Sequence, residues 1–471
     1  MFLPVERRPL FLGEVQTWRL FCRITHQQPK RCSMKCGEPN LHFVFLFIFL
    51  LSGAICGFVV FLGSQLQEGV MRAPTHLDLR LAECGDYPSE ICRALFQQRP
   101  LSMTFGKMCQ DLYQTDPESS NLQGSVDCRQ YIQKRGYITQ PMSEEEKNFP
   151  LAFVITIHKD FATFEVLLRN IYHPQNIYCI HVDAKSEESF KQQVSSLVEC
   201  FDNVFLVSRS EDVVYAGFSR LQADINCLQD LVAAPTPWHV VLNLCGQDFP
   251  LRTNLEIVQL LSSVRRQQNI TPGIPQPKRM AYRTNNAYQE HLAVRGRPGK
   301  IQLIGRRKDP PPHNLTLFFG SAYYVLTRSF VSFVLSDQRA LDLLDWSKDT
   351  FSPDEHYWVT LNHLPEAPGS VGSNVTWQGN VKLVKWKDQE KRVHNGCGGR
   401  YLHNICVYGL GDLPWLVNKT HLFANKFEAQ TYPLVLECME RWHRGRLVDQ
   451  ALSKGTLVPS DNFTVFLGPV L

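Results

Sequence analysis

Two adjacent carboxylates, Asp354 and Glu355, follow a serine and a proline in the stretch FSPDEHYW. A carboxylate that points into a cleft can accept a proton from a hydroxyl group that attacks a substrate. The stretch also fits the start of a helix, with Ser352 as N-cap, Pro353 at the first helical position and Glu355 completing a capping box. The local pattern favours capping and leaves a role as a base open, because a carboxylate at a helix N-terminus stays ionised.

A third acidic residue, Asp183, follows the apolar stretch NIYCIHV and precedes Ala184 and Lys185. Enzymes that hold a diphosphate through a divalent metal usually carry two acidic residues separated by one other residue. Here Asp183 would be the first acidic residue, and the position of the second is occupied by Lys185. The alternative is a plain strand-to-helix turn with Ser186 as the helix cap. If this site binds a diphosphate, cations of the protein must replace the metal. Lys426 in HLFANKF is one such cation, although a lone lysine is more often a solvated surface charge.

Other signals narrow the function. Trp386 in LVKWK is either a core residue or an aromatic face on which a sugar ring stacks. The sequence has no G-x-S-x-G, P-loop, H-E-x-x-H or paired C-x-x-C motif, so hydrolase, kinase and zinc functions lose their usual support. A net charge of +4 over 471 residues, without a block of lysine and arginine, gives no indication of a nucleic-acid partner.

Apolar runs alternate with helical spacings from residue 150 onwards. PLAFVITIH, NIYCIHVDAKS, NVFLVS and WHVVLNLCGQDFPL are predicted strands, and FEVLLRNIY, SFKQQVSSLVECF and FSRLQADINCLQDLVAA are predicted helices. The alternation predicts an α/β fold with a mainly parallel sheet and helices on both faces. His158, Asp183 and the turn 246–248 fall at strand ends, where such sheets bind ligands. The Pro-, Arg- and Lys-rich residues 269–312 are predicted to form a long functional loop.

An uncharged apolar run over 41–62 is long enough to cross a bilayer. Basic residues crowd its N-terminal side, which predicts a single-pass type II topology rather than a buried core helix. We therefore predict a cytosolic tail over 1–40, a transmembrane signal anchor over 41–62, a stem and N-terminal luminal extension over 63–148, and a catalytic domain over 149–471. Eleven of the 15 cysteines follow the run, as expected of a segment that folds in an oxidising lumen. Five N-glycosylation sequons follow it too: Asn269, Asn314, Asn374, Asn418 and Asn462.

Several long blocks carry a resemblance to one family. NIYCIHVDAKSEESF, VVYAGFSRLQADINCLQDL, NLCGQDFPLRTNLEIV, DTFSPDEHYWVTL, LVKW and CVYGLGDLPWLVNKTHLFANKF resemble the core 2 and I-branching β-1,6-N-acetylglucosaminyltransferases of the Golgi. The resemblance covers about residues 150–438. It implies a GT-A glycosyltransferase fold behind a membrane anchor and stem, in the Golgi lumen. It also implies inverting transfer of GlcNAc, without a metal or other cofactor, from UDP-GlcNAc to the 6-hydroxyl of a sugar on a glycoprotein or glycolipid.

The resemblance assigns roles to residues. Glu355 matches the catalytic base. The nucleotide-sugar contacts that it implies are Thr156, Ile157, His158, Asp183, Ala184, Lys185, Tyr215, His403 and Lys426. The acceptor contacts that it implies are Trp386, Lys278 and Arg283. The disulfides that it implies are Cys92 with Cys438, Cys128 with Cys200, Cys179 with Cys227, and Cys397 with Cys406. Cys245 is then free, and Cys84 and Cys109, which have no counterpart in the family, are candidates for a further pair.

Two positions depart from the family. His403 replaces an arginine that faces the phosphates, and histidine lacks both a full charge at neutral pH and the bidentate fork of arginine. Asp388 replaces an aromatic acceptor contact. Three hypotheses stay open: an active β-1,6-N-acetylglucosaminyltransferase, a luminal glycan-binding or regulatory protein that has lost turnover, and a transferase that uses another UDP-sugar such as UDP-xylose.

Overall fold

The computed structural model describes residue 84 and the ranges 88–110, 127–263, 268–294, 298–372 and 381–453. All of them belong to one unit, which begins at His76. The predicted anchor over 41–62 lies outside these ranges. Within them, no helix combines the length and the apolar character needed to span a bilayer.

A five-stranded sheet forms the centre of this unit, in the spatial order β10–β4–β1–β2–β3. Its strands are β1 (Leu151–Ile157), β2 (Ile177–Val182), β3 (Val204–Leu206), β4 (Val240–Cys245) and β10 (Val325–Thr327). The first four are parallel and β10 is antiparallel, which confirms the predicted mainly parallel sheet. The chain moves outward from β1 to β3 and then returns to the other side of β1. The carboxyl ends of β1 and β4 therefore form a topological switch point, where open α/β sheets bind ligands.

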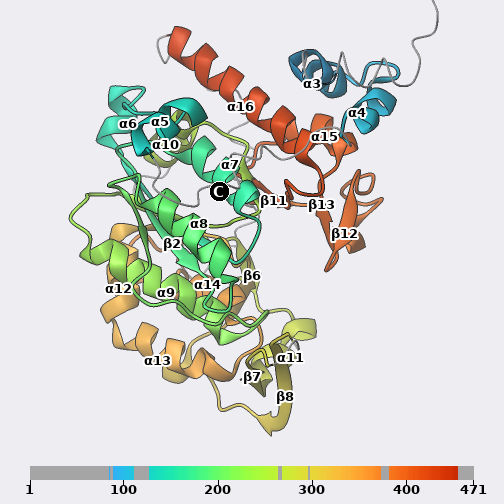
Figure 1. Cartoon of the computed structure of the whole chain (residues 1–471). Coiled ribbons are helices and arrows are strands. Elements are labelled where there is room, and N and C mark those ends of the chain that lie inside the picture. Colours follow the sequence, from blue (N-terminus) through green and yellow to red (C-terminus); the bar gives the residue numbers. More distant parts are fainter. Residues whose placement is uncertain are drawn as a thin grey trace, which may run out of the picture. The chain divides into compact units, whose positions relative to one another are not determined.

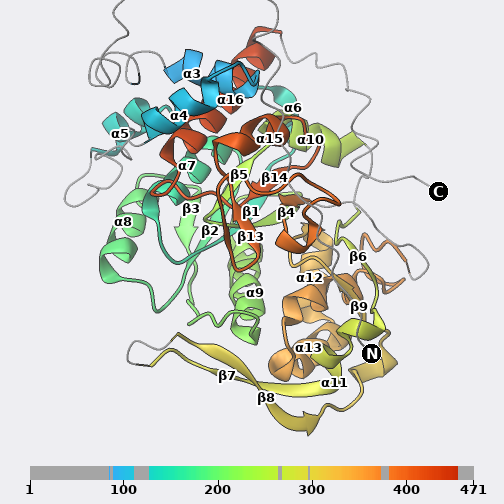
Figure 2. The same ribbon diagram turned by 90° about the vertical axis from the view of Figure 1, so that its right-hand side faces the viewer.

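Helices cover both faces of the sheet, as the alternation of the sequence predicts (Figures 1 and 2). Phe153 and Ile155 of β1 point to one core, and Ala152 and Val154 point to the other, because successive strand residues face opposite sides. The helices that pack on the first core are α7 (Phe161–Ile171), α8 (Glu188–Val198) and α10 (Asn254–Ser263). Those on the second are α9 (Phe218–Ala233), α12 (Arg328–Ser336) and α13 (Gln338–Trp346).

A third core lies under a second, smaller sheet, in the order β11–β14–β5. Its strands are β11 (Lys382–Val384), β14 (Phe423–Asn425) and β5 (Asp248–Pro250). The helices around this core are α3 (Pro88–Phe96), α4 (Ser102–Gln110), α15 (Leu413–Val417) and α16 (Pro433–Leu452). The described part of the segment predicted as a stem extension thus contains α3 and α4, together with α5 (Cys128–Arg135) and α6 (Glu144–Asn148).

Five disulfides stabilise the described part of the chain. The structure pairs Cys92 with Cys438, Cys128 with Cys200, Cys179 with Cys227, and Cys397 with Cys406, as the resemblance implies. Cys84 pairs with Cys109, and Cys245 is a free thiol. The bond to Cys438 closes 346 residues and ties α3 to α16.

The predicted strand over 238–251 is two strands in the structure, β4 and β5, and they are separated at the turn predicted over 246–248. Asp248 Oδ2 accepts the backbone N–H of Cys245 at 2.8 Å, which closes this turn. A Cβ atom on Gly246 would lie 2.8 Å from Cγ2 of Ile157, so only glycine lets the turn pass so close to β1.

The predicted long loop over 269–312 is also wrong, because this segment contains a β-ribbon. It contains β6 (Gly273–Pro275), the 3-10 helix η1 (Lys278–Met280), α11 (Tyr282–Asn285), β7 (Asn286–His291) and β8 (Lys300–Arg307). β7 and β8 pair with each other and with no other strand, and Figure 2 shows them set apart from the central sheet. Most side chains of β8 are exposed, including the apolar Leu303 and Ile304, so burial in this strand does not follow the apolar positions of the sequence.

Asn269 is a further correction. Its side chain is fully buried, donates to Asn362 and to the carbonyl of Pro368, and accepts from Thr327. A glycan on Nδ2 would break these bonds, so this sequon is not usable in the folded chain. Asn314 and Asn418 are exposed. Asn374 and Asn462 lie outside the described residues.

Candidate active site

The first two predicted nucleotide-sugar segments meet at the carboxyl ends of β1 and β2. Asp183 donates its backbone N–H to the carbonyl of Ile157 at 2.9 Å, next to Thr156 and His158. The Ser186 hydroxyl donates to the carbonyl of His158 at 3.0 Å. The predicted strand-to-helix turn between β2 and α8 is confirmed, but Ser186 joins the two strand ends and does not cap the helix.

The Asp183 carboxylate is paired with a cation of the protein. Lys185 Nζ lies 2.5 Å from Asp183 Oδ2 and 3.3 Å from Asp212 Oδ1. It also donates to the carbonyl of Val213 at 2.5 Å. The strand-end acid and the loop that follows β3 are thus connected through one lysine.

That loop carries Tyr215, whose side chain is 74% exposed. The backbone carbonyl of its neighbour Ala216 accepts the N–H of Ser352 at 2.7 Å. This bond brings the nucleotide-sugar loop to the FSPDEHYW stretch. Burial, followed by the charge of Glu355, raises the pKa of Tyr215.

The predicted base Glu355 ends the 3-10 helix η4 (Pro353–Glu355). Its side chain is 31% exposed, and its Oε2 forms an ion pair with Nη1 of Arg283 from α11. Among the described residues, no hydrogen-bond donor occupies Oε1. Burial raises the pKa of Glu355, and the charge of Arg283 and its hydrogen bond oppose that rise. Arg283 therefore favours the ionised carboxylate that a base requires.

The predicted capping box is confirmed in position only: Ser352 is the N-cap of η4 and Pro353 is its first residue, but the capping hydrogen bonds are missing. Ser352 has a φ of 46° in the left-handed region, and its side chain makes no capping hydrogen bond. The helix that follows, α14 (Tyr357–Leu361), begins only after Glu355 and has no side-chain cap either. The short helix η4 therefore carries the predicted base Glu355 without a side-chain cap.

The two adjacent carboxylates lie in different environments. Asp354 is buried, and burial, opposed mainly by the charge of Arg220, raises its pKa to about 7. Arg220 itself forms an ion pair with Asp224 at 2.5 Å. Glu355 is consequently the member of the pair that is accessible and paired with an arginine of its own.

Tyr215 also meets a residue from a distant part of the chain. Its ring stacks on that of His403, with ring centroids 6.0 Å apart. His403 is exposed in the turn between β12 (Arg400–Leu402) and β13 (Ile405–Val407). Trp386 forms a β-bridge with Ile405, and its side chain is 38% exposed. The predicted acceptor-binding tryptophan therefore lies beside the hairpin that carries His403.

Lys426 follows β14, which pairs with β5, and its neighbour Asn425 donates to Asp248 at 2.8 Å. Desolvation by burial lowers the pKa of Lys426. Within the described ranges no carboxylate lies within ion-pair distance of its Nζ. The N–H of the next residue, Phe427, donates to the carbonyl of Gln247 at 2.9 Å, in the turn whose Gly246 N–H donates to the carbonyl of Thr156 of β1 at 3.1 Å. Lys426 is thus a half-buried cation near the end of β1, not a solvated surface charge.

Two further cations near Lys426, Arg400 and Lys159, are already close to a carboxylate. Arg400 forms an ion pair with Glu428 at 2.7 Å, and Lys159 lies 3.8 Å from the same residue. Sequence reasoning missed Glu428, although it stands two residues after Lys426. Lys278 in η1 is exposed, and no contact in the described ranges joins it to Glu355.

Asp388 lies exposed in η5 (Lys387–Gln389), two residues after Trp386. In the described ranges, one group of three side chains has the spacing of metal ligands: Cys397, Cys406 and Asp412. Both sulfurs belong to a disulfide, and Asp412 forms an ion pair with Lys385, so this group does not fit a metal.

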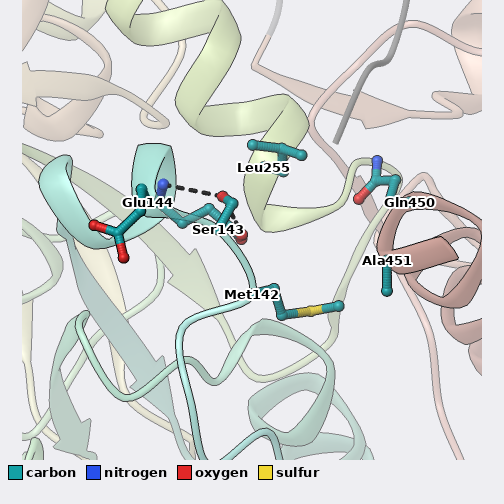
Figure 3. Close-up of a pocket in the computed structure, with 7 residues that line it drawn as sticks. Met142, Ser143, Glu144, Leu255, Gln450 and Ala451 are labelled. Carbon is teal, nitrogen blue, oxygen red and sulfur yellow. Dashed lines mark hydrogen bonds between the residues drawn. The ribbon is translucent and has the colours of Figure 1, made fainter. Parts of the chain in front are cut away.

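A cavity of about 270 Å³ lies elsewhere, between α6, α10 and α16. Figure 3 shows Met142, Ser143 and Glu144 on one side of it, with Leu255, Gln450 and Ala451 on the others. None of the predicted site residues lines this cavity, so we do not assign the candidate active site to it.

The mixed α/β architecture, with its polar cluster at the switch point of a mainly parallel sheet, fits a GT-A-like glycosyltransferase. The family model for the Core-2/I-Branching enzyme matches residues 151–417. A human N-acetyllactosaminide beta-1,6-N-acetylglucosaminyl-transferase is 50% identical over 363 residues, which cover 77% of this chain and 86% of the relative. The human probable beta-1,3-galactosyl-O-glycosyl-glycoprotein beta-1,6-N-acetylglucosaminyltransferase 7 is 50% identical over 373 residues, covering 79% and 85%.

A mouse beta-1,3-galactosyl-O-glycosyl-glycoprotein beta-1,6-N-acetylglucosaminyltransferase 3 is 40% identical over 341 residues, covering 70% of this chain and 76% of the relative. The chain therefore belongs to the Core-2/I-branching enzyme family of glycosyltransferases. This confirms the family that the sequence blocks resemble.

Proposed function

We propose that this chain transfers GlcNAc from UDP-GlcNAc, in β-1,6 linkage, to a sugar of an O-glycan or a lactosamine chain. The names of its relatives support both the transferred group and these two acceptor classes. The observation that carries the proposal is the partly exposed Glu355 carboxylate, paired with Arg283 and joined through Ser352 and Ala216 to the Tyr215 loop.

The proposed reaction is a single inverting displacement. Glu355 accepts the proton of the acceptor hydroxyl through the oxygen that Arg283 leaves free, while the hydroxyl oxygen attacks the anomeric carbon. The bond from that carbon to the UDP oxygen breaks, and the electron pair leaves with UDP. Inversion at this carbon converts the α-linked donor into a β-linked product.

The departing UDP gains negative charge on its diphosphate, and cations near it stabilise that charge. Lys426 is suited to this role because it is half-buried, where a charge acts more strongly than in water. We propose that it acts with His403 and that no metal is required. The pairing of Asp183 with Lys185 supports this, since the strand-end acid is already neutralised by a protein cation.

We further propose a single-pass type II protein of the Golgi membrane whose described unit is luminal. Five disulfides support an oxidising compartment.

The test is an acceptor array with the secreted protein, a panel of UDP-sugars, and EDTA in half of the wells. Transfer of GlcNAc in EDTA with a β-1,6 product supports the proposal. Transfer only from UDP-xylose or another donor would contradict the sugar assignment, and loss of transfer on chelation would contradict the metal-free mechanism. Failure of UDP to raise the Tm would favour a protein without donor binding, because a ligand of the native state stabilises it.

A further inference from the structure

Helix α9 starts directly after the Tyr215 loop, and its N-terminus is capped by a distant side chain. The N-cap position is Gly217, which has no side chain to satisfy the free N–H groups of the first turn. Oε1 of Glu290 accepts the N–H of Ser219 at 2.8 Å and lies 3.3 Å from the Ser219 hydroxyl. Glu290 belongs to β7 of the ribbon, 71 residues further along the chain.

The carboxylate fits closely against the N-cap. A Cβ atom on Gly217 would lie 1.9 Å from Oε1 of Glu290, and its three nearest neighbours would all be atoms of that side chain. Gly217 has φ −95° and ψ 172°, which any residue adopts. Glycine is therefore needed here for space, and the space is filled by Glu290.

Hydrogen bonds connect this cap to the proposed site. The Ser219 hydroxyl accepts the N–H of Val214 at 2.8 Å, on one side of Tyr215. On the other side, the carbonyl of Ala216 accepts the N–H of Ser352, at the start of the turn that presents Glu355. Both ends of the short segment around Tyr215 are thus fixed, and Glu290 supports one of them through Ser219.

We propose that Glu290 is a positioning residue: from the ribbon it caps α9 and so holds the Tyr215 loop in the conformation that binds the nucleotide-sugar. This inference rests on the proposed function. It gives the ribbon a role in the donor site, in addition to the contact of Arg283 with the base at the ribbon's other end.

The experiment compares Glu290→Ala, Glu290→Gln and the control Gln289→Ala, an exposed neighbour on β7. We expect Glu290→Ala to raise the KM for UDP-GlcNAc about tenfold, the loss expected for a hydrogen bond to a charged group, while the acceptor KM stays unchanged. Glu290→Gln keeps an acceptor oxygen for Ser219 and should restore most of the affinity. Gln289→Ala should match the wild type.

A second comparison uses the close approach of Gly217. Gly217→Ala must displace the carboxylate, so alone it should raise the donor KM as Glu290→Ala does. In the Glu290→Ala background the same alanine meets no carboxylate and should add little, because the two changes remove one interaction. Fully additive effects on KM would overturn the proposal.

The outcomes separate the two proposals. One outcome is that the wild type transfers GlcNAc and that Glu290→Ala lowers only the apparent kcat, by the fraction of the protein that is misfolded. This outcome overturns the positioning role and leaves the proposed function intact. A wild type inactive with every UDP-sugar overturns the proposed function. Amide hydrogen exchange then decides the positioning role: faster exchange at Val214 and Ser219 in Glu290→Ala supports it, and unchanged exchange overturns it.

Discussion

Arg283 donates through Nη1 to Oε2 of Glu355, although 72 residues separate the two in the chain. The guanidinium also lies over the rings of Phe319 and Phe351, with its central carbon 5.3 and 5.2 Å from their centroids. These contacts fix the arginine beside the carboxylate in a partly desolvated setting, where a paired charge shifts ionisation strongly. The relationship makes Arg283 the ion-pair partner of the proposed base, a role beyond its predicted acceptor contact.

Arg283→Met should move the acidic limb of the pH profile of kcat/KM to higher pH by about one pH unit. The arginine lowers the pKa of Glu355 against the effect of burial, so its loss lets the pKa rise and protonates the base at a pH where the wild type is active. A measurement of initial rates from pH 5 to 8 checks this.

The matched control for that profile is Arg279→Met, which removes an exposed arginine of η1. Its acidic limb should coincide with the wild type. A uniform loss of rate in Arg283→Met, with an unmoved limb, would show that the arginine serves acceptor binding alone.

Lys426→Met should weaken UDP binding about ten- to a hundredfold, the range for loss of a charged hydrogen-bond partner. The lysine is half-buried, so the variant would lose a partly desolvated charge that a bound diphosphate could contact. The rise of Tm with UDP concentration gives the affinity. Lys147→Met, at an exposed lysine of α6, is the control, and an equal UDP response in the two variants would remove Lys426 from the donor site.

Asp354→Asn should stabilise the fold increasingly as the pH rises from about 4 to 7. The pKa of Asp354 is raised from 3.8 to about 7, so in this window the native state holds a proton that the unfolded state has lost, and wild-type stability falls as the pH rises. The asparagine side chain does not ionise, so the variant avoids this loss, and its free energy of unfolding should exceed that of the wild type by at most about 4 kcal/mol at the upper end of the window. Urea unfolding at pH 4.5 and 7.5 measures the difference, and an equal effect of the substitution at both values would place the ionisation elsewhere.

The central sheet could be predicted from the sequence because its strands are buried on both faces. Continuous apolar runs such as Leu151–Ile157 alternate with amphipathic helices, and that pattern has one common solution. The ribbon over 286–307 could not be predicted, since its exposed strands carry charged and polar residues without a period. Gly246 shows the same limit, because its turn depends on contact with a strand 89 positions earlier in the chain.

The candidate site was predicted in part. The ends of β1 and β2 follow from the topology, and the remaining residues came from the resemblance. The pairs Arg283 with Glu355, and Glu290 with Ser219, join segments that are 72 and 71 residues apart, so no local spacing indicates them. The choice of Glu355 over Asp354 came from the resemblance, and the structure adds that Asp354 is buried whereas Glu355 is partly exposed.

The most direct test of the account is the turnover of Glu355→Gln with UDP-GlcNAc and an acceptor that the wild type uses. We predict a fall in kcat of at least about a hundredfold, because a general base contributes that much or more, with UDP raising the Tm as in the wild type. Glu437→Gln, at a partly exposed glutamate of α16, should retain full activity. A Glu355→Gln variant that keeps the wild-type kcat would contradict the account.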